Sequence, residues 1–187
     1  MPWTNGPLVL YHGCDHASAA SIITPTSPNQ HGVQLAHSRP LTDFGRGFYT
    51  TTSFHQAKNW ANSRCRRLKR TTTPWLATIL RFEVDRNQLT PLAVAPNQLA
   101  PLEKLCFVIE NSNADYWDLV RHCRRGGNHL LRGNRNYDVV FGLVSLWPQT
   151  LVVKDCDQIS FHTSRGLSVL LNPSIAAQGT SSNPFLP

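Results

Sequence analysis

The sequence has little charge and no long apolar run. Only 16% of its 187 residues are Asp, Glu, Lys or Arg, whereas 41% are hydrophobic. This composition disfavours an acidic disordered chain or a long solvent-exposed helix. The longest apolar stretch, 139–147, is interrupted by Gly142 and Ser145 and falls short of the roughly 20 residues that a membrane-spanning helix needs. The first residues lack a basic stretch followed by an apolar core, so we expect neither a secretory signal nor a membrane partner.

The cysteines lack a metal-binding or redox spacing. There are five of them, no two are closer than 17 residues, and no CxxC occurs. A zinc ribbon and a thioredoxin-like motif are therefore disfavoured. We expect reduced thiols, no metal and a cytoplasmic location.

The charge that is present is mostly positive. Eighteen Lys and Arg stand against eleven Asp and Glu, which gives a formal net charge of +7. This balance favours acidic partners such as nucleic acid, a dinucleotide or an acidic protein surface. The length fits one domain that buries its own core.

Short helices and strands follow one another without a regular βαβ alternation, and this pattern favours an α+β fold. Strands are predicted at 8–12, 47–51, 75–84, 137–144, 151–153 and 158–162. Helices are predicted at 17–23, 53–69, 102–109 and 115–123, with Asp15 and Ser53 at the first two starts. The long polar loop 24–46 is expected to be functional or mobile. We expect one domain over 1–171 and a flexible, Pro- and Ser-rich tail over 172–187.

Three short motifs stand out together. They are Tyr11-His12-Gly13, the segment 43–51 (DFGRGFYTT) and the segment 158–161 (QISF). In this order they resemble the ADP-ribosyltransferase superfamily, in the branch shared by diphtheria toxin and the poly-ADP-ribose polymerases. That branch carries a His-Tyr-Glu triad on three separate strands. The likeness is greatest to small bacterial toxin-like members and covers roughly residues 8–171.

The resemblance implies an H-Y-Q triad of His12, Tyr49 and Gln158. His12 would bind a ribose hydroxyl of NAD, and Gly13 would offer its backbone N–H and C=O to the nicotinamide carboxamide. Tyr49 would stack on the nicotinamide ring, and Gln158 occupies the position of the glutamate. A site that cleaves the nicotinamide–ribose bond must orient the ribose and stabilise positive charge that develops on it.

The resemblance also implies where the rest of NAD binds. NAD would lie in a cleft between two split β-sheets with flanking helices, covered by the 24–46 loop. Arg39 and Arg46 would meet its phosphates. The remaining contacts are expected from Tyr11, Gly47 and Phe48.

Gln158 departs from the family pattern because an amide cannot act as a general base. This departure favours single transfer over polymer elongation. Asp157 should face away from Gln158, since successive strand residues alternate. Glu103, Glu110 and Asp138 are the other carboxylates that could approach this position, and the sequence does not distinguish among them. A gain in NAD hydrolysis by Gln158→Glu would show that the site is built for glutamate chemistry.

Each of these residues also has a plainer interpretation. His12 fits an ordinary strand-end histidine, Tyr49 a core aromatic and Gln158 a surface strand residue. Two basic clusters fit either solvated surface or phosphate and nucleic-acid binding. The clusters are Arg64, Arg66, Arg67, Lys69 and Arg70, and Arg121, Arg124, Arg125, Arg132 and Arg135.

The resemblance implies a transferase, a mono-ADP-ribosyltransferase that takes NAD as substrate and releases nicotinamide. Its acceptor would be a protein or a nucleic acid, and a cognate antitoxin or immunity protein is a possible partner. The setting would be a bacterial toxin or effector acting in the cytoplasm of its own or a target cell. The alternatives are an NAD glycohydrolase and a catalytically inactive NAD- or nucleic-acid-binding module.

Overall fold

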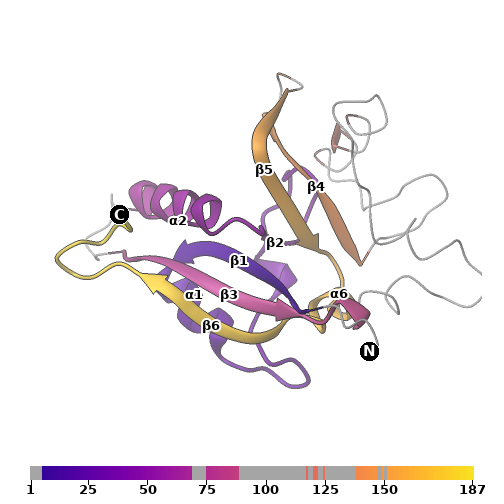
Figure 1. The fold of residues 1–187 in the computed structure, drawn as a ribbon, viewed down its shortest axis with the longest axis horizontal. Coiled ribbons are helices and arrows are strands. Elements are labelled where there is room, and N and C mark those ends of the chain that lie inside the picture. Colours follow the sequence, from indigo (N-terminus) through magenta and orange to yellow (C-terminus); the bar gives the residue numbers. More distant parts are fainter. Residues whose placement is uncertain are drawn as a thin grey trace, which may run out of the picture. The chain divides into compact units, whose positions relative to one another are not determined.

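A computed structural model describes residues 6–68, 75–88, 138–146, 149 and 151–187, together with the helical residues Trp117, Val120, Arg121 and Arg124. The chain forms two compact units. The first consists of residues 1–33, 50–85 and 170–187, and the second of 34–49 and 86–169. Helices accompany two antiparallel three-stranded sheets, so the predicted α+β class with two separate sheets is confirmed (Figure 1).

The sheet of the first unit has the order β1-β3-β6. Its strands are β1 (Leu8–Asp15), β3 (Ala77–Val84) and β6 (Leu171–Gln178), and both pairings are antiparallel. Along the central strand β3, Ile79 and Leu80 are both fully buried although they point to opposite faces. Both faces of this sheet are therefore covered.

Two helices of the first unit begin where the sequence predicts. The helix α1 (His16–Ile23) is capped by Asp15, whose Oδ1 accepts a 2.9 Å hydrogen bond from the Ser18 N–H. The helix α2 (Phe54–Leu68) follows Ser53, whose hydroxyl accepts from the Gln56 N–H at 3.2 Å. Both caps satisfy backbone donors that the first helical turn leaves unpaired.

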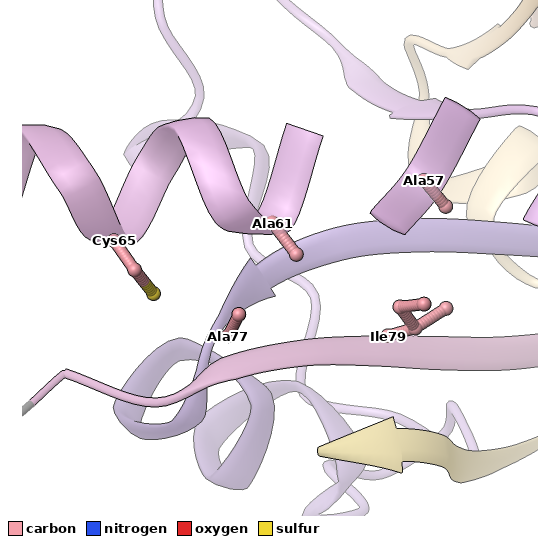
Figure 2. Close-up of a cluster of buried hydrophobic side chains, with 5 residues drawn as sticks. All are labelled: Ala57, Ala61, Cys65, Ala77 and Ile79. Atoms are coloured by element: carbon pink, nitrogen blue, oxygen red, sulfur yellow. The ribbon is translucent and has the colours of Figure 1, made fainter. Parts of the chain in front are cut away.

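The helix α2 packs on the first sheet through small side chains. Figure 2 shows Ala57, Ala61 and Cys65 of α2 turned toward Ala77 and Ile79 of β3. These five residues are at most 1% exposed. The three alanines among them let the helix backbone approach the strands closely. The backbone of α2 also lies close to the neighbouring strand β1, at Gly13.

The expected flexible tail at 172–187 is wrong for the residues that form β6. Residues 171–178 pair with β3, and β6 is the edge strand on which Pro173 is tolerated. The last residues return to α2, because the Asn62 side chain exchanges two 2.9 Å hydrogen bonds with the Leu186 backbone. The ordered part of the first unit thus extends beyond residue 171.

The sheet of the second unit has the order β2-β5-β4. Its strands are β2 (Phe48–Thr50), β5 (Leu151–Phe161) and β4 (Val139–Leu146), and β4 pairs with β5 in antiparallel fashion. The strands predicted separately at 151–153 and 158–162 form the single strand β5. The register of the β4–β5 pair shifts between Leu143 and Ser145 of β4, and the pairing is regular from Asp157 through the QISF motif.

Two short helical turns complete the described part of the second unit. They are η1 (Leu35–His37), within the 24–46 loop, and α6 (Ser164–Leu167), which starts at the Thr163 cap. The predicted helix 102–109 lies outside the described residues. Of the predicted helix 115–123, Trp117, Val120 and Arg121 are helical, and the first two are buried.

Candidate functional site

Gly13 of the first motif has a structural reason to be glycine. A Cβ at this position would overlap the Ala57 carbonyl oxygen and lie 2.8 Å from the Ala61 backbone nitrogen. Both neighbours are backbone atoms of α2, which cannot move aside as a side chain can. The absence of a side chain at Gly13 is therefore required by the packing of α2 on β1.

The backbone of Gly13 faces in a different direction from its missing side chain. In β1, Tyr11 exchanges two hydrogen bonds of 2.8 and 2.9 Å with Thr51, on the edge away from β3. Backbone groups in an antiparallel strand alternate between its two edges, so those of Gly13 face the same way as those of Tyr11. Among the described residues, none pairs with the backbone at Gly13 on this edge. The half-buried Gly13 therefore presents one donor and one acceptor side by side.

His12 points to the face of the sheet opposite α2. It is paired with Leu80, whereas Gly13 is paired with Ile79, a residue of the α2-facing cluster. Directly paired residues of antiparallel strands share a face. His12 is half-buried there. Tyr11, on the α2 side, meets the ring of Phe54 edge-on at 5.4 Å.

In the second unit, the Tyr49 hydroxyl is bound by the turn that precedes it. It accepts hydrogen bonds of 2.9 Å from the Phe44 N–H and the Thr42 hydroxyl, and it donates to the Gly45 carbonyl at 2.8 Å. Gly45 has a φ of 76°, a conformation that favours glycine. The phenol thus holds the DFGRG turn, and the half-buried ring stacks nearly parallel to the Phe44 ring, with centroids 6.5 Å apart.

His162, which directly follows QISF, also contacts Tyr49. Its ring meets the Tyr49 ring edge-on, with centroids 6.1 Å apart. Its Nδ1 lies 2.9 Å from the Arg46 carbonyl oxygen, which only accepts, so Nδ1 carries the proton. Its Nε2 then accepts from the buried Ser160 hydroxyl at 2.6 Å. Desolvation lowers the pKa of His162 to about 4, against the opposing effect of the Arg46 hydrogen bond, so the imidazole is neutral near pH 7.

The other predicted contacts of the GRGF segment have local structural roles. Gly47 is buried, and a Cβ there would lie 2.5 Å from the His162 ring. Phe48 is buried in β2. Arg46 donates to the carbonyls of Ala36 and Ser38 at 3.0 and 2.8 Å and so fastens the loop that contains η1.

Arg39 is exposed on the same loop as η1. Arg46, in contrast, has the two backbone partners described above, and both belong to its own unit. A role for either arginine in binding phosphate stays a prediction.

Gln158 is nine-tenths buried, unlike the surface strand residue of its plainer interpretation. Its Nε2 donates to the Asp43 carboxylate at 2.9 Å and to the Leu143 carbonyl at 2.8 Å. Asp43 also accepts from the Arg124 guanidinium at 2.8 Å and the Ser145 N–H at 2.9 Å. A carboxylate that sequence reasoning did not consider is therefore the one bound to Gln158.

The turn before β2 brings two predicted site residues together. The consecutive residues Asp43 and Phe44 bind Gln158 and the Tyr49 hydroxyl, respectively. Of the carboxylates considered from the sequence, Asp138 accepts a hydrogen bond from the Thr163 hydroxyl. Glu103 and Glu110 lie outside the described residues. His12, Gly13 and Tyr11 belong to the first unit, and Tyr49 and Gln158 to the second.

The basic clusters make several contacts within the chain. Arg64 pairs with Asp15 at 3.1 Å, Arg66 lies over the Phe185 ring, and Arg124 pairs with Asp43. The residues Lys69, Arg70, Arg125, Arg132 and Arg135 lie outside the described part. In the described ranges, no group of three His, Cys, Asp or Glu side chains gathers as a metal site would require. No described helix has the length and hydropathy to cross a bilayer.

Comparison with known proteins identifies a family for most of the chain. The model of the family described as "Protein of unknown function (DUF3990)" matches residues 8–171, from the start of β1 to the first residue of β6. No curated protein and no solved structure matches the chain. The matched region includes the YHG, DFGRGFYTT and QISF motifs. Because it covers most of the 187 residues, the chain belongs to the DUF3990 family.

Proposed function

We propose that the protein is a mono-ADP-ribosyltransferase that takes ADP-ribose from NAD and attaches it to a macromolecular acceptor. In this reaction the bond between the ribose C1′ and the nicotinamide nitrogen breaks, and nicotinamide leaves as a neutral molecule. A nucleophilic atom of the acceptor bonds to C1′ and loses its proton to solvent or to a base. The proposal rests on the motif resemblance together with the geometry of the two units.

The observation that carries the proposal is the backbone of Gly13. An amide group needs one acceptor for its N–H and one donor for its C=O, side by side. The Gly13 N–H and C=O on the edge of β1 are such a pair, and the carboxamide of nicotinamide is such an amide. The described structure pairs Tyr11, two residues earlier on this edge, with Thr51, which follows Tyr49 by two residues. The Gly13 donor and acceptor therefore lie on the same edge of β1, two residues beyond this pair within the first unit.

The second unit supports the proposal through the roles left to Tyr49 and Gln158. Three hydrogen bonds fix the Tyr49 hydroxyl, so its ring keeps one orientation and is suited to hold a planar nicotinamide. Both Nε2 protons of Gln158 are engaged, which leaves Oε1 to accept a hydrogen bond from a ribose hydroxyl. His12, from the first unit, is the proposed second ribose contact.

The acceptor class and the setting belong to the same proposal. The net charge of +7 favours an acidic protein or a nucleic acid as acceptor. A bacterial toxin or effector acting in a cytoplasm, restrained by an antitoxin or immunity protein, is the setting that the resemblance implies. Neither choice changes the chemistry at C1′.

The test is to incubate the full chain with biotin-labelled NAD and a cell extract, and to measure both free nicotinamide and labelled macromolecules. We expect nicotinamide release with a label that either protease or nuclease removes, and the enzyme that removes it identifies the acceptor class. Release of nicotinamide without any label would instead make the protein an NAD glycohydrolase. An absence of both products would contradict the proposal and favour a binding module.

Variants of His12 and Tyr49 link the activity to the proposed site. His12→Ala should abolish nicotinamide release, whereas His55→Ala, at an exposed position of α2, should not change it. Tyr49→Ala should abolish release, but it also removes the anchor of the DFGRG turn. Tyr49→Phe is the matched variant, because it keeps the ring and removes only the hydroxyl. We expect Tyr49→Phe to retain more release than Tyr49→Ala, and equal losses would contradict stacking as the role of the ring.

A further inference from the structure

Asp43 is the one carboxylate that the described structure places against Gln158. It is 8% exposed and joins three parts of the second unit, because its partners are a helical arginine, a backbone N–H of β4 and the amide of Gln158 on β5. Its charge is compensated by Arg124 at 2.8 Å. The three donors hold this nearly buried carboxylate in one orientation.

The polarity of this network determines how the Gln158 amide is turned. The Asp43 carboxylate and the Leu143 carbonyl can only accept hydrogen bonds, and both lie within 2.9 Å of the same side-chain atom. Only the NH2 group can occupy that place, and both of its protons are used there. The Oε1 atom must therefore point away from Asp43.

The same polarity makes this position suited to glutamine and unsuited to glutamate. A carboxylate at 158 would face two acceptors at distances where only a donor is favourable, and one of them carries a negative charge. This geometry argues against a site built for glutamate chemistry, so we do not expect Gln158→Glu to raise NAD hydrolysis. The resemblance implies a negative side chain at position 158. In this structure the negative side chain is Asp43, which accepts a hydrogen bond from Gln158.

We propose that Asp43 is a positioning residue that orients the Gln158 amide, so that Oε1 is the acceptor presented to a ribose hydroxyl of bound NAD. The inference deepens the proposed function and rests on it. The Asp43 anion also polarises the amide, since an N–H that donates to a carboxylate makes the carbonyl oxygen of the same group a better acceptor. Asp43 itself does not need to touch the substrate.

A double-mutant cycle on nicotinamide release tests this role. Asp43→Asn keeps the size of the side chain and an oxygen that can accept from Gln158, but it removes the charge of that acceptor. It should lower kcat by about tenfold while changing the KM for NAD little, because a neutral hydrogen bond replaces a charge-assisted one. In the Gln158→Ala background the same change should have no further effect on kcat, because there is no amide left to orient. The matched control is Asp138→Asn, a carboxylate of the same unit bound to Thr163, which should leave kcat unchanged.

Two kinetic results would overturn the proposal. One is wild-type kcat in Asp43→Asn, and the other is an equal loss of kcat from this change with and without Gln158. Gln158→Glu sharpens the test, since we expect it to lower release at pH 7. A gain in nicotinamide release would overturn the conclusion that the Asp43 network suits glutamine, and not glutamate, at position 158.

A readout that needs no NAD chemistry separates this inference from the proposed function. The side-chain NH2 protons of Gln158, assigned in NMR spectra by their loss in Gln158→Ala, should exchange slowly with water in the wild type. Exchange should accelerate by about tenfold or more in Asp43→Asn but not in Asp138→Asn. If the wild type releases no nicotinamide, the proposed function fails and this exchange measurement alone decides whether Asp43 orients Gln158. Exchange unchanged in Asp43→Asn would overturn that role.

Discussion

The two units keep their motif residues in place by different means. In the first unit, Gly13 lies under α2 because small residues such as Ala57 and Ala61 bring a helix backbone against the strand. In the second unit, the side chains of Tyr49 and Gln158 are fixed by hydrogen bonds to backbone and charged groups. One unit therefore depends on close packing, and the other on matched donors and acceptors.

This difference indicates how each motif should respond to change. Close-packed backbone tolerates no added atom, and the cost of one appears in stability whatever the pH. A polar network keeps its volume after an isosteric substitution, but it responds to a changed proton or donor. Substitutions at matched positions of the two units, and changes of pH, can therefore separate the two modes.

The largest effect is expected for Gly13→Ala in the first unit. The new Cβ would overlap the Ala57 carbonyl oxygen, and only a shift of α2 could relieve this. We expect a loss of about 3 kcal/mol or more in the free energy of unfolding, at the upper end of overpacking costs. Urea titration followed by circular dichroism measures it.

The control for that substitution is Gly6→Ala in the same unit. A Cβ at Gly6 would have no heavy atom within 4 Å, so its unfolding free energy should equal that of the wild type. Equal stabilities for the two alanine variants would show that α2 does not confine Gly13. Close packing would then not be what keeps the motif of the first unit in place.

The second effect is a pH dependence that arises in the second unit. His162 has a pKa of about 4 in the folded chain, against 6.5 for an ordinary histidine, because burial disfavours its charged form. The unfolded chain therefore takes up the proton first. The stability due to neutral His162 is complete above pH 6.5 and is lost as the pH falls toward 4, by about 3 kcal/mol in total.

Urea titrations at pH 7, 5.5 and 4.5 measure this loss. His162→Gln cannot titrate in this range, so its stability should vary less between these pH values than that of the wild type. His55→Gln, at an exposed site of α2, should keep the wild-type dependence. A wild-type slope that survives in His162→Gln would assign the pH response to other groups.

Local patterns in the sequence predict most of the described elements. The caps Asp15 and Ser53 and the strands at 8–12, 47–51 and 75–84 follow from neighbouring residues, and the structure confirms them. The strand β6 is not predicted, because Pro173 and the polar residues around it are typical of a loop. They are tolerated because β6 is at the edge of its sheet.

The polar network of the second unit could not be predicted from spacing. Asp43 and Gln158 are 115 residues apart in the sequence, so no local pattern connects them. His162 follows directly after QISF, but its role depends on the Arg46 carbonyl, 116 residues earlier. Motif order identifies Tyr49 and Gln158 as notable, whereas the partners that orient them are set by the fold.

The smallest effect is expected for a polar contact in the unit that depends on packing. Burial acts to raise the pKa of Asp15, but the hydrogen bonds from Ser18 and the Arg64 guanidinium together lower it below 3.8. Asp15→Asn keeps the Oδ1 acceptor of the helix cap, but its NH2 group replaces Oδ2, which accepts from the Ser18 hydroxyl and from Arg64. Because the Arg64 side chain is about a third exposed and can turn to solvent, we expect a cost of about 1 kcal/mol at pH 7. Because the folded pKa is lowered, this contribution is complete above pH 3.8 and disappears as the pH falls further.

The comparison is made in the His162→Gln background, where the larger pH response is absent. Two proteins are compared, His162→Gln and the double variant His162→Gln/Asp15→Asn. The difference between their free energies of unfolding should be smaller at pH 3 than at pH 7, and urea titrations at both pH values measure it. If Asp15→Asn lowered the free energy of unfolding at pH 7 by as much as the His162 effect, the first unit would also depend strongly on a polar group. The contrast between packing in one unit and polar matching in the other would then not hold.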